Sequence, residues 1–326
     1  MTDITGDAIV VEDVRKSFGD VHAVRGLSFS APAGSVLGVL GPNGAGKTTT
    51  VSILSTLTKP DAGRALVAGH DVVREAAAVR SSIMLTGQFA ALDEVLTGRE
   101  NLVLFGRLMG LRPRQAKVRA TELLEQFALT EAADRRVGGY SGGMRRRVDI
   151  ACGLVRQPKV VFLDEPTTGL DPVSRQGVWS LVRSLKEQGV TTLLTTQYLE
   201  EADALSDNII VIDKGTVIAE GTADELKARS GSSYCEVVPV DAGEVPAVVT
   251  ALHGLGVITV AESKDRVSLP APDGAATLAE ALRRITDSRI ELIDIALRRP
   301  SLDEVFIELT TSSMDEPALV PSGVNP

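Results

Sequence analysis

Aromatic residues are scarce in this chain of 326 residues, since Phe, Trp and Tyr together make up 3% of it. A core with so few rings must be built from Val, Leu, Ile and Ala, a composition typical of parallel sheets covered by helices. Cysteine is almost absent, and Cys152 and Cys235 form no CxxC pair. The sequence therefore indicates neither a disulfide framework nor a zinc site, and we expect a reducing cytoplasm.

Long apolar runs are missing as well. Nowhere do 18 uncharged apolar residues follow one another, so we expect no membrane-spanning helix and a membrane role only through a partner chain. The opening residues, MTDITGDAIVVEDV, have acids but no basic stretch before an apolar one, which argues against a secretory signal. A net charge of −9 argues weakly against a nucleic-acid partner, because binding to phosphate backbones depends on basic surface.

The hydrophobic pattern predicts an α/β fold. Residues 8–30 mix β-branched residues with turn signals, as antiparallel strands do. Helix-favouring residues dominate from about 97 to 157, where Thr97 and Glu100 fit a capping box. NIIVIDKGTVIAEG reads as a hairpin that turns at residues 213–215. Short apolar strands are expected at SVLGVL, KVVFLDEP and TTLLTT.

The pattern restarts after a Ser/Gly stretch near residue 230. The order of strands and helices beyond it is β-α-β-β-α-β, which predicts a small α+β domain of ferredoxin-like type. A last helix is expected from Ser301, and the Pro, Ser and Gly of the final residues predict a disordered tail. The expected divisions are a first domain at 1–228, a linker at 229–233, an α+β domain at 234–310 and a tail at 311–326.

Residues Gly41 to Thr48, GPNGAGKT, fit the phosphate-loop pattern G-x-x-x-x-G-K-[ST]. They follow an apolar strand and precede a helical pattern, which is the context that such a loop requires. Glycines let successive N–H groups face a phosphate, and the helix N-terminus adds positive potential. Lys47 is expected to reach the β- and γ-phosphates and the Thr48 hydroxyl to ligate Mg²⁺. The expected nucleotide contacts are Gly41, Asn43, Gly44, Ala45, Gly46, Lys47, Thr48 and Thr49.

Two carboxylates narrow the chemistry further. VVFLDEP carries Asp164 and Glu165 to the C-terminal end of a buried strand, where ligands of parallel sheets bind. Asp164 is expected to hold Mg²⁺ through water, and Glu165 to polarise the attacking water. The structural alternative is an acidic turn after a strand, which the phosphate loop upstream makes the weaker interpretation.

Between these motifs lies YSGGMRRR, Tyr140 to Arg147. Ser-Gly-Gly is by itself a flexible turn, but a helical run follows at once. Such a turn exposes Ser141, the N–H of Gly143 and a helix N-terminus as an anion site. The three arginines could form a nucleic-acid patch; in an acidic chain we expect a solvated helix face with one or two ion pairs instead.

GPNGAGKTT, a Gln at 88, YSGGM, VVFLDEP and GLDP in this order resemble the nucleotide-binding subunit of ABC transporters over about residues 7–228. YSGGMRRRVDIACGL, LTTQYLEEADALSD and RRPSLDEVF are similar to the daunorubicin-resistance-type ATPases, to about residue 310. That group works with separate membrane subunits and includes exporters of anthracycline antibiotics and of phthiocerol-type wax lipids. The resemblance implies a P-loop, RecA-like nucleotide-binding domain with an antiparallel β-subdomain and a helical subdomain at about 90–157.

In that family two subunits enclose two ATP molecules head to tail. Carried over, Gln88 would sense Mg²⁺ and the attacking water, Asp171 would span the dimer interface, and Phe18 would stack on adenine. Each residue also has a plainer interpretation: Gln88 as an amide in a loop, Asp171 as a helix N-cap and Phe18 as an ordinary core residue. Tyr140 and Met144 depart from the commoner Leu and Gln, which we expect to leave phosphate contact unchanged. The residues implied to contact the γ-phosphate on the other protomer are Ser141, Gly142 and Gly143.

Gln197 in TTQYLEEADAL stands where most members of the family have His. That position requires a hydrogen bond to the γ-phosphate or the attacking water, and a Gln amide offers both a donor and an acceptor. It cannot become cationic, so a charge-assisted part of the contact is lost. Because Glu165 remains as the base, and because the daunorubicin-resistance-type proteins also read TTQYL, we expect an active ATPase with a modified sensor.

The expected function is therefore the ATPase subunit of an exporter of drugs or complex lipids, bound to membrane permease subunits at the cytoplasmic face of the membrane. The apolar helix from Glu100 to Leu111 is a candidate docking surface. The alternative is a soluble ABC-type ATPase of translation or DNA repair. One set of motifs in the chain, the short spacing from Lys47 to Ser141 and the acidic charge argue against it. Residues 234–310 are expected to form a regulatory or assembly module.

Overall fold

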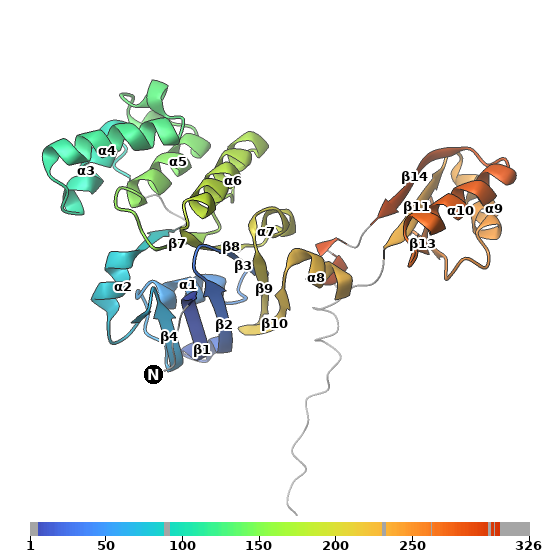
Figure 1. Ribbon diagram of the computed structural model, residues 1–326, viewed down its shortest axis with the longest axis horizontal. Helices are drawn as coiled ribbons and strands as arrows, with labels where there is room; N and C mark the ends of the chain where they lie inside the picture. The colour runs from blue at the N-terminus through green and yellow to red at the C-terminus, as the bar shows by residue number, and fades with distance from the viewer. Residues whose placement is uncertain are drawn as a thin grey trace, which may run out of the picture. The chain divides into compact units, whose positions relative to one another are not determined.

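The computed structural model describes residues 6–87, 92–229, 233–261, 263–298, 301–302 and 304–306. The chain divides into two compact units, Met1–Ala223 and Asp224–Pro326, and each is described by itself (Figure 1). The predicted linker lies mostly outside the described residues, and the predicted tail lies wholly outside them. The domain boundaries stated above stay predictions.

The first unit opens with an antiparallel sheet in the order β2-β1-β4-β5. Its long hairpin pairs Ile9 with Ala31 and Phe18 with Val21, so the antiparallel strands predicted within residues 8–30 are confirmed. Every second or third side chain, such as Ile9, Val14 and Leu27, turns into the core. The strands are β1 (Asp7–Phe18), β2 (Val21–Pro32), β4 (Ala62–Val67) and β5 (His70–Asp71).

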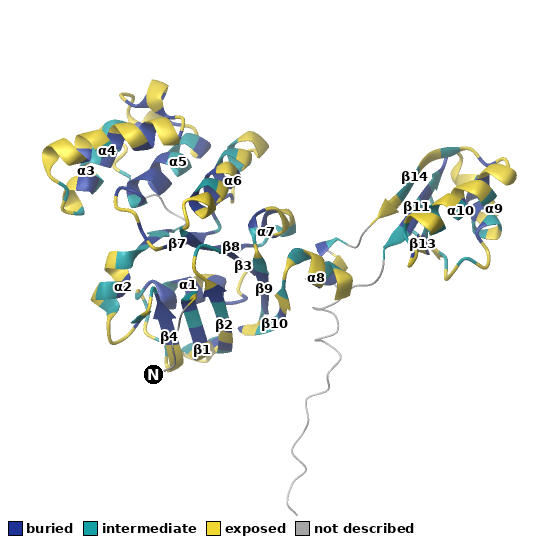
Figure 2. Cartoon of the chain, in the orientation of Figure 1, coloured by how far each residue is buried: buried dark blue, intermediate teal, exposed yellow. Residues whose placement is uncertain are grey.

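A six-stranded sheet forms the centre of this unit, in the order β10-β9-β3-β8-β7-β6. All pairs are parallel except the β9–β10 hairpin, whose turn at Lys214-Gly215 matches the predicted one. Strands β3, β7 and β8 are buried along their whole length, as Figure 2 shows. Their carboxyl ends share one edge of the sheet. The strands are β3 (Val36–Leu40), β6 (Ile83–Thr86), β7 (Val160–Asp164), β8 (Thr191–Thr196), β9 (Asn208–Asp213) and β10 (Thr216–Gly221).

Helices complete the first unit, and α3, α4 and α5 lie together in Figure 1 as a helical block. The predicted capping box is confirmed, since Thr97 Oγ1 accepts from Glu100 N and Glu100 accepts from Thr97 N. The helices are α1 (Lys47–Leu54), α2 (Ala76–Ser82), α3 (Gly98–Leu108), α4 (Pro113–Gln126), α5 (Gly142–Gly153), α6 (Pro172–Glu187) and α7 (Leu199–Leu205), with short 3₁₀ turns at Thr130–Ala132 and Val137–Gly139. No helix in the described ranges is long and apolar enough to cross a membrane.

The second unit follows the predicted β-α-β-β-α-β order, and its antiparallel sheet runs β12-β13-β11-β14. Cys235 and Val237 of β11 pair with Leu269 and Val267 of β13, and all four are buried against α9 and α10. The predicted final helix is described only at 302 and 304–306. The elements are α8 (Ala223–Arg229), β11 (Tyr234–Pro239), a 3₁₀ turn (Ala242–Glu244), α9 (Val245–Ala251), β12 (Thr259–Val260), β13 (Val267–Pro270), α10 (Ala275–Asp287) and β14 (Leu292–Arg298).

Candidate functional site

The loop between β3 and α1 is held so tightly that side chains larger than hydrogen do not fit at two of its glycines. A Cβ on Gly41 would collide with the carbonyl oxygen of Ile212, and one on Gly46 would lie 2.5 Å from the carbonyl oxygen of Ala23. Gly46 also has φ +106°, a conformation that favours glycine. The sequence therefore needs glycine at these places to bring the backbone of the loop against β9 and β2.

Lys47 begins α1 and its side chain is 4% exposed. Its ammonium donates to the carbonyl oxygens of Gly41, at 2.7 Å, and Pro42, at 3.1 Å, and lies 3.3 Å from Oε1 of Glu165. The structure therefore brings the predicted phosphate-binding cation and the predicted base into direct contact.

Asp164 ends β7 beside Thr48 and Thr195. Thr48 Oγ1 donates to Oδ1 of Asp164 at 3.3 Å, and Thr195 Oγ1 donates to the same oxygen at 2.6 Å. Thr195 Oγ1 also accepts from the Glu165 N–H at 3.0 Å. One hydroxyl therefore orients both acidic residues. Sequence reasoning missed Thr195, because only the parallel register that pairs it with Asp164 places it there.

Lys47, Thr48 and Glu165 line a cavity of about 530 Å³ at the carboxyl edge of the sheet, and Asp164 and Thr195 lie behind them. Its cations include Arg25, Lys47 and Lys214. The sequence did not predict Lys214 as a residue of this site, because the pattern of a hairpin turn does not indicate which segment packs against the turn. In the fold, Gly215 N donates to Ala45 O at 3.0 Å and fastens that turn to the loop. The lining residues are Val21, His22, Ala23, Arg25, Pro42, Asn43, Gly44, Gly46, Lys47, Thr48, Thr49, Glu165 and Lys214.

Phe18, predicted to stack on adenine, does not line this cavity. It ends β1 with 53% of its surface exposed, and the Lys16 ammonium lies 5.5 Å from the centre of its ring. Phe18 pairs with Val21, which does line the cavity. The interpretation of Phe18 as an ordinary core ring is therefore wrong, because a core ring would be buried.

Ser141 is the N-cap of α5, and its Oγ accepts from Met144 N at 3.3 Å. A Cβ on Gly143 would collide with the side chain of Ser174, so the first turns of α5 and α6 touch. Asp171 caps α6 and accepts from the N–H and the hydroxyl of Ser174, at 2.9 and 2.6 Å. The bond from the Ser174 hydroxyl lowers the pKa of Asp171. Ser141, Gly142, Gly143 and Asp171 thus lie at two adjoining helix starts, and none of them lines the cavity around Lys47.

Gln197 is half-buried in the bend between β8 and α7. The preceding residue, Thr196, accepts at its carbonyl oxygen from Gly41 N at 3.3 Å, so this bend adjoins the start of the phosphate loop. Gln88 lies outside the described residues, one position after Gly87. Further along α7, Glu201 is fully buried and accepts from Trp179 Nε1 at 3.2 Å; burial raises the pKa of this carboxyl.

The prediction of a solvated arginine face on α5 is wrong for Arg146, although the expected ion pairs are present. The Arg146 side chain is only 10% exposed, and burial lowers its pKa while the carboxylates of Asp149 and Asp164 oppose that shift. Arg145 does form one expected ion pair, at 3.0 Å from Glu94. Arg147 donates to the carbonyl oxygen of Phe127 at 2.9 Å. The pattern of charges along a helix could not show this, because the acceptors are backbone carbonyls of distant segments.

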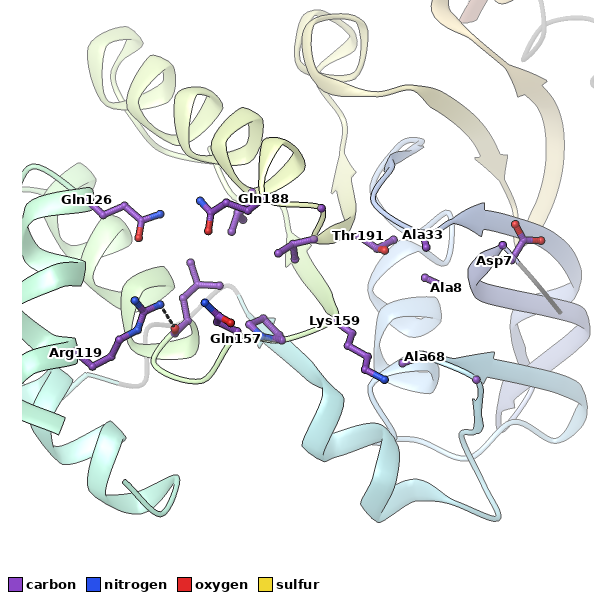
Figure 3. A pocket seen from close by; sticks show the side chains of 17 residues that line it. Asp7, Ala8, Ala33, Ala68, Arg119, Gln126, Gln157, Lys159, Gln188 and Thr191 are labelled. Carbon is purple, nitrogen blue, oxygen red and sulfur yellow. Dashed lines mark hydrogen bonds between the residues drawn. The ribbon is translucent and has the colours of Figure 1, made fainter. Parts of the chain in front are cut away.

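A larger cavity, about 810 Å³, lies at the opposite edge of the sheet (Figure 3). Lys159, which precedes β7, and Thr191, which begins β8, line it, and Arg119 reaches across to the carbonyl oxygen of Leu154 at 3.1 Å. Its walls carry amides such as Gln126 and Gln188. Its lining includes none of the site residues predicted from the sequence, and the two cavities share no lining residue.

Comparison with known proteins agrees with this geometry. Residues 24–168 match the ABC transporter family, and residues 221–310 match the C-terminal domain of ATP-binding proteins like DrrA1-3. The doxorubicin resistance ATP-binding protein DrrA of Mycobacterium tuberculosis is 60% identical over 97% of either chain. The daunorubicin resistance ATP-binding protein DrrA3 of Streptomyces coeruleorubidus is 56% identical over 93% of this chain and 96% of its own.

A solved structure is similar in fold: the dimeric post-hydrolysis state of the ATP-binding cassette MJ0796 with ADP and phosphate. It has a TM-score of 0.60 and 25% identity, and the similarity covers 66% of this chain and 98% of that one. The expected fold class, a P-loop α/β nucleotide-binding domain with a small α+β domain after it, is confirmed by such structures and by the sheets described above. The chain therefore belongs to the ABC transporter family, as an ATP-binding and ATP-hydrolysing transport subunit with a DrrA-like C-terminal domain.

Proposed function

We propose that ATP binds with Mg²⁺ in the cavity around Lys47 and is hydrolysed there to drive drug export through separate membrane subunits. The observation that carries the proposal is that Lys47, Thr48 and Glu165 line one cavity, where Lys47 contacts Glu165 and Thr48 donates to Asp164. The loop residues that would surround the phosphates are Gly41, Asn43, Gly44, Ala45, Gly46, Lys47, Thr48 and Thr49.

The donor set fits Mg²⁺. The Thr48 hydroxyl and the Asp164 carboxylate are oxygen ligands that lie 3.3 Å apart, and Mg²⁺ in nucleotide sites takes one or two such ligands and leaves the rest to phosphates and water. We propose Gln88, which lies outside the described residues, as a third ligand. When bound, the ion would supply charge neutralisation at the phosphates.

Glu165 is the proposed general base, with Gln197 as the sensor of the γ-phosphate. The Lys47 ammonium, now shared between Glu165 and two carbonyls, would turn to the phosphates and release the carboxylate to accept a proton from water. Gln197 follows the strand that carries Thr195, so both arise from the same strand end. Its amide can donate to a phosphate oxygen without any change of protonation.

We propose a second copy of the chain as a partner. Ser141, Gly142, Gly143 and Asp171 do not line their own chain's cavity, which leaves the two helix starts available to a nucleotide held by another copy. The dimeric cassette that the fold resembles supports this arrangement. Phe18, exposed at the end of β1, is the proposed platform for adenine at the other end of the nucleotide.

The proposed site of contact with membrane permease subunits is the outer surface of α3 and the residues before it. Leu108 is 75% exposed, Val95 69% and Leu104 39%, which is unusual for large aliphatic side chains so close together in the chain. Docking there would hold the chain at the cytoplasmic face of the membrane. We propose residues 234–310 as a module of regulation or assembly, and deletion of that segment should weaken complex formation while ATP binding persists.

The proposed substrates are anthracycline-like drugs, because the relatives reported above are named for resistance to doxorubicin and daunorubicin. Complex lipids of the phthiocerol type stay a prediction. Host cells that carry wild type or Glu165→Gln distinguish the two. Loss of anthracycline efflux in the variant would support drug export; unchanged efflux, with one lipid class lost from the surface by mass spectrometry and accumulated inside, would favour lipid instead.

Glu165→Gln tests the site itself. The amide keeps the size of the side chain but cannot accept a proton, so ATP turnover should fall by about 100-fold or more while ATP affinity persists. Glu122→Gln, a change of the same kind at an exposed carboxylate of α4, is the matched control and should turn over like wild type. Equal turnover by both variants would remove Glu165 from the role of base.

A further inference from the structure

The three arginines that follow the Ser-Gly-Gly turn contact three different parts of the first unit. Arg145 pairs with Glu94, and Arg147 donates to the carbonyl oxygens of Phe127 and Ala128 at 2.9 and 3.3 Å. Both contacts hold segments next to the helical block. Arg146 instead reaches the carboxyl ends of β6 and β7, where the proposed catalytic residues begin.

All three nitrogens of the Arg146 guanidinium donate hydrogen bonds there. Its Nε donates to Pro166 O at 3.1 Å, Nη1 to Gly87 O at 2.8 Å, and Nη2 to Thr86 Oγ1 at 3.2 Å and Asp164 O at 3.5 Å. A carboxylate oxygen of Asp149 lies 3.6 Å from Nη1. With 10% of the side chain exposed, this is a built contact rather than a surface one. Only arginine offers five donors in a rigid plane.

Glu165 lies between Asp164, the last residue of β7, and Pro166, and Arg146 donates to the carbonyl oxygens of both. Its φ is +47°, in the left-handed region that residues with a Cβ rarely adopt. Such a conformation persists only where the surroundings fix it, and it is common at functional sites. On one side the backbone of Glu165 is fixed by Thr195, through the Glu165 N–H. Arg146 fixes the carbonyls before and after it.

We propose that Arg146 is a positioning residue for ATP hydrolysis: it holds the backbone on both sides of Glu165 and so aims the Glu165 carboxylate at the attacking water. This inference rests on the role proposed above for Glu165. Because Arg146 projects from α5, the same contact ties Glu165 to the helix whose N-terminus is proposed to meet the second copy's nucleotide. A movement of α5 when the dimer closes would therefore be transmitted through Arg146 to the backbone of Glu165.

The test compares Arg146→Gln with Arg147→Gln in the purified full chain. Arg146 and Arg147 are neighbours on α5, and each donates to backbone carbonyls of another segment. Both variants should therefore lower the melting temperature. Only Arg146→Gln should lower kcat, by between about 10-fold and 100-fold, as expected for misplacement of a reacting group by about 1 Å. The KM for ATP and the affinity for a fluorescent ATP analogue should stay within about twofold of wild type, because none of the described hydrogen bonds of Arg146 goes to the phosphate loop.

Arg146→Lys keeps the charge and should recover part of kcat. It also serves in place of Arg146→Gln if that variant is not recovered folded, with the same expectation of a lower kcat at unchanged ATP affinity. Equal kcat values for the Arg146 and Arg147 variants would overturn the proposal. A Glu165→Gln variant that still turns over ATP would show instead that the proposed base is wrong, which separates the two failures.

Discussion

Replacing Thr195 by valine should loosen both acidic residues of the nucleotide site at once. Valine keeps the β-branched shape within a fully buried strand but has no hydroxyl. Asp164 then loses its 2.6 Å donor, and the Glu165 N–H loses its 3.0 Å acceptor. The N–H keeps a second acceptor, Thr195 O at 3.2 Å, so the larger loss falls on the carboxylate.

A hydrogen bond to a charged group contributes about 1.5–3 kcal/mol. Among the described residues, the Asp164 carboxylate then retains the longer bond from Thr48. We therefore expect Thr195→Val to lower the free energy of unfolding by about 2 kcal/mol. For a unit of this size that corresponds to a fall in Tm of about 4–8 °C, measured by calorimetry. ATP turnover should fall as well, since the positions of Asp164 and Glu165 relax together.

Thr192→Val is the matched control on the same strand. The Thr192 hydroxyl is fully buried and has no hydrogen-bond partner among the described atoms. Its removal should leave Tm unchanged or raise it, because an unpaired buried hydroxyl only costs desolvation. Equal falls in Tm for the two variants would show that strand packing, and not the bridge to Asp164, determines the effect, and would refute the reasoning.

Three further outcomes follow from the described contacts. Gln197→Ala should hydrolyse ATP more slowly than wild type, and wild-type turnover would contradict the sensor role. Because burial raises the pKa of Glu201, the folded protein keeps the proton of this carboxyl at pH values where the unfolded chain has lost it. The free energy of unfolding should therefore fall as the pH rises from about 4 through the raised pKa. The fluorescence of Trp179 follows unfolding, and Glu201→Gln should abolish the fall. Cys152 and Cys235 are buried in different units, with pKa values raised by burial, so thiol labelling in urea should report the unfolding of each unit separately, and labelling of either without denaturant would contradict it.

Much of the fold could be predicted because its signals are local. The capping box of Thr97 and Glu100, the turn at residues 213–215 and the β-α-β-β-α-β order depend on neighbours within a few residues, and all agree with the structure. The pattern of the phosphate loop is local as well, and Gly46 is required by its own backbone, whose φ is +106°. The contacts that exclude a Cβ at Gly41 and Gly46 come instead from Ile212 and Ala23, which lie far away in the chain.

The arginines of α5 show where prediction from sequence failed. Spacing on a helix indicates which side chains share a face, but not what lies against that face. Arg146 is buried because the ends of β6 and β7, from residues far away in the chain, present their carbonyls to it. Phe18 likewise could be read as core or as exposed until the strand end that carries it was placed.

The sequence by itself determined the family, the nucleotide chemistry and the residues of its motifs, because a phosphate loop and a carboxylate pair after a buried strand need particular residue types at fixed spacing. Only the tertiary structure decided which residues support them. Strand register pairs Thr195 with Asp164, the β9–β10 turn brings Lys214 to the cavity, and packing of α5 buries Arg146. Those contacts join segments that are far apart in the chain, and no local pattern encodes the partner on the other side.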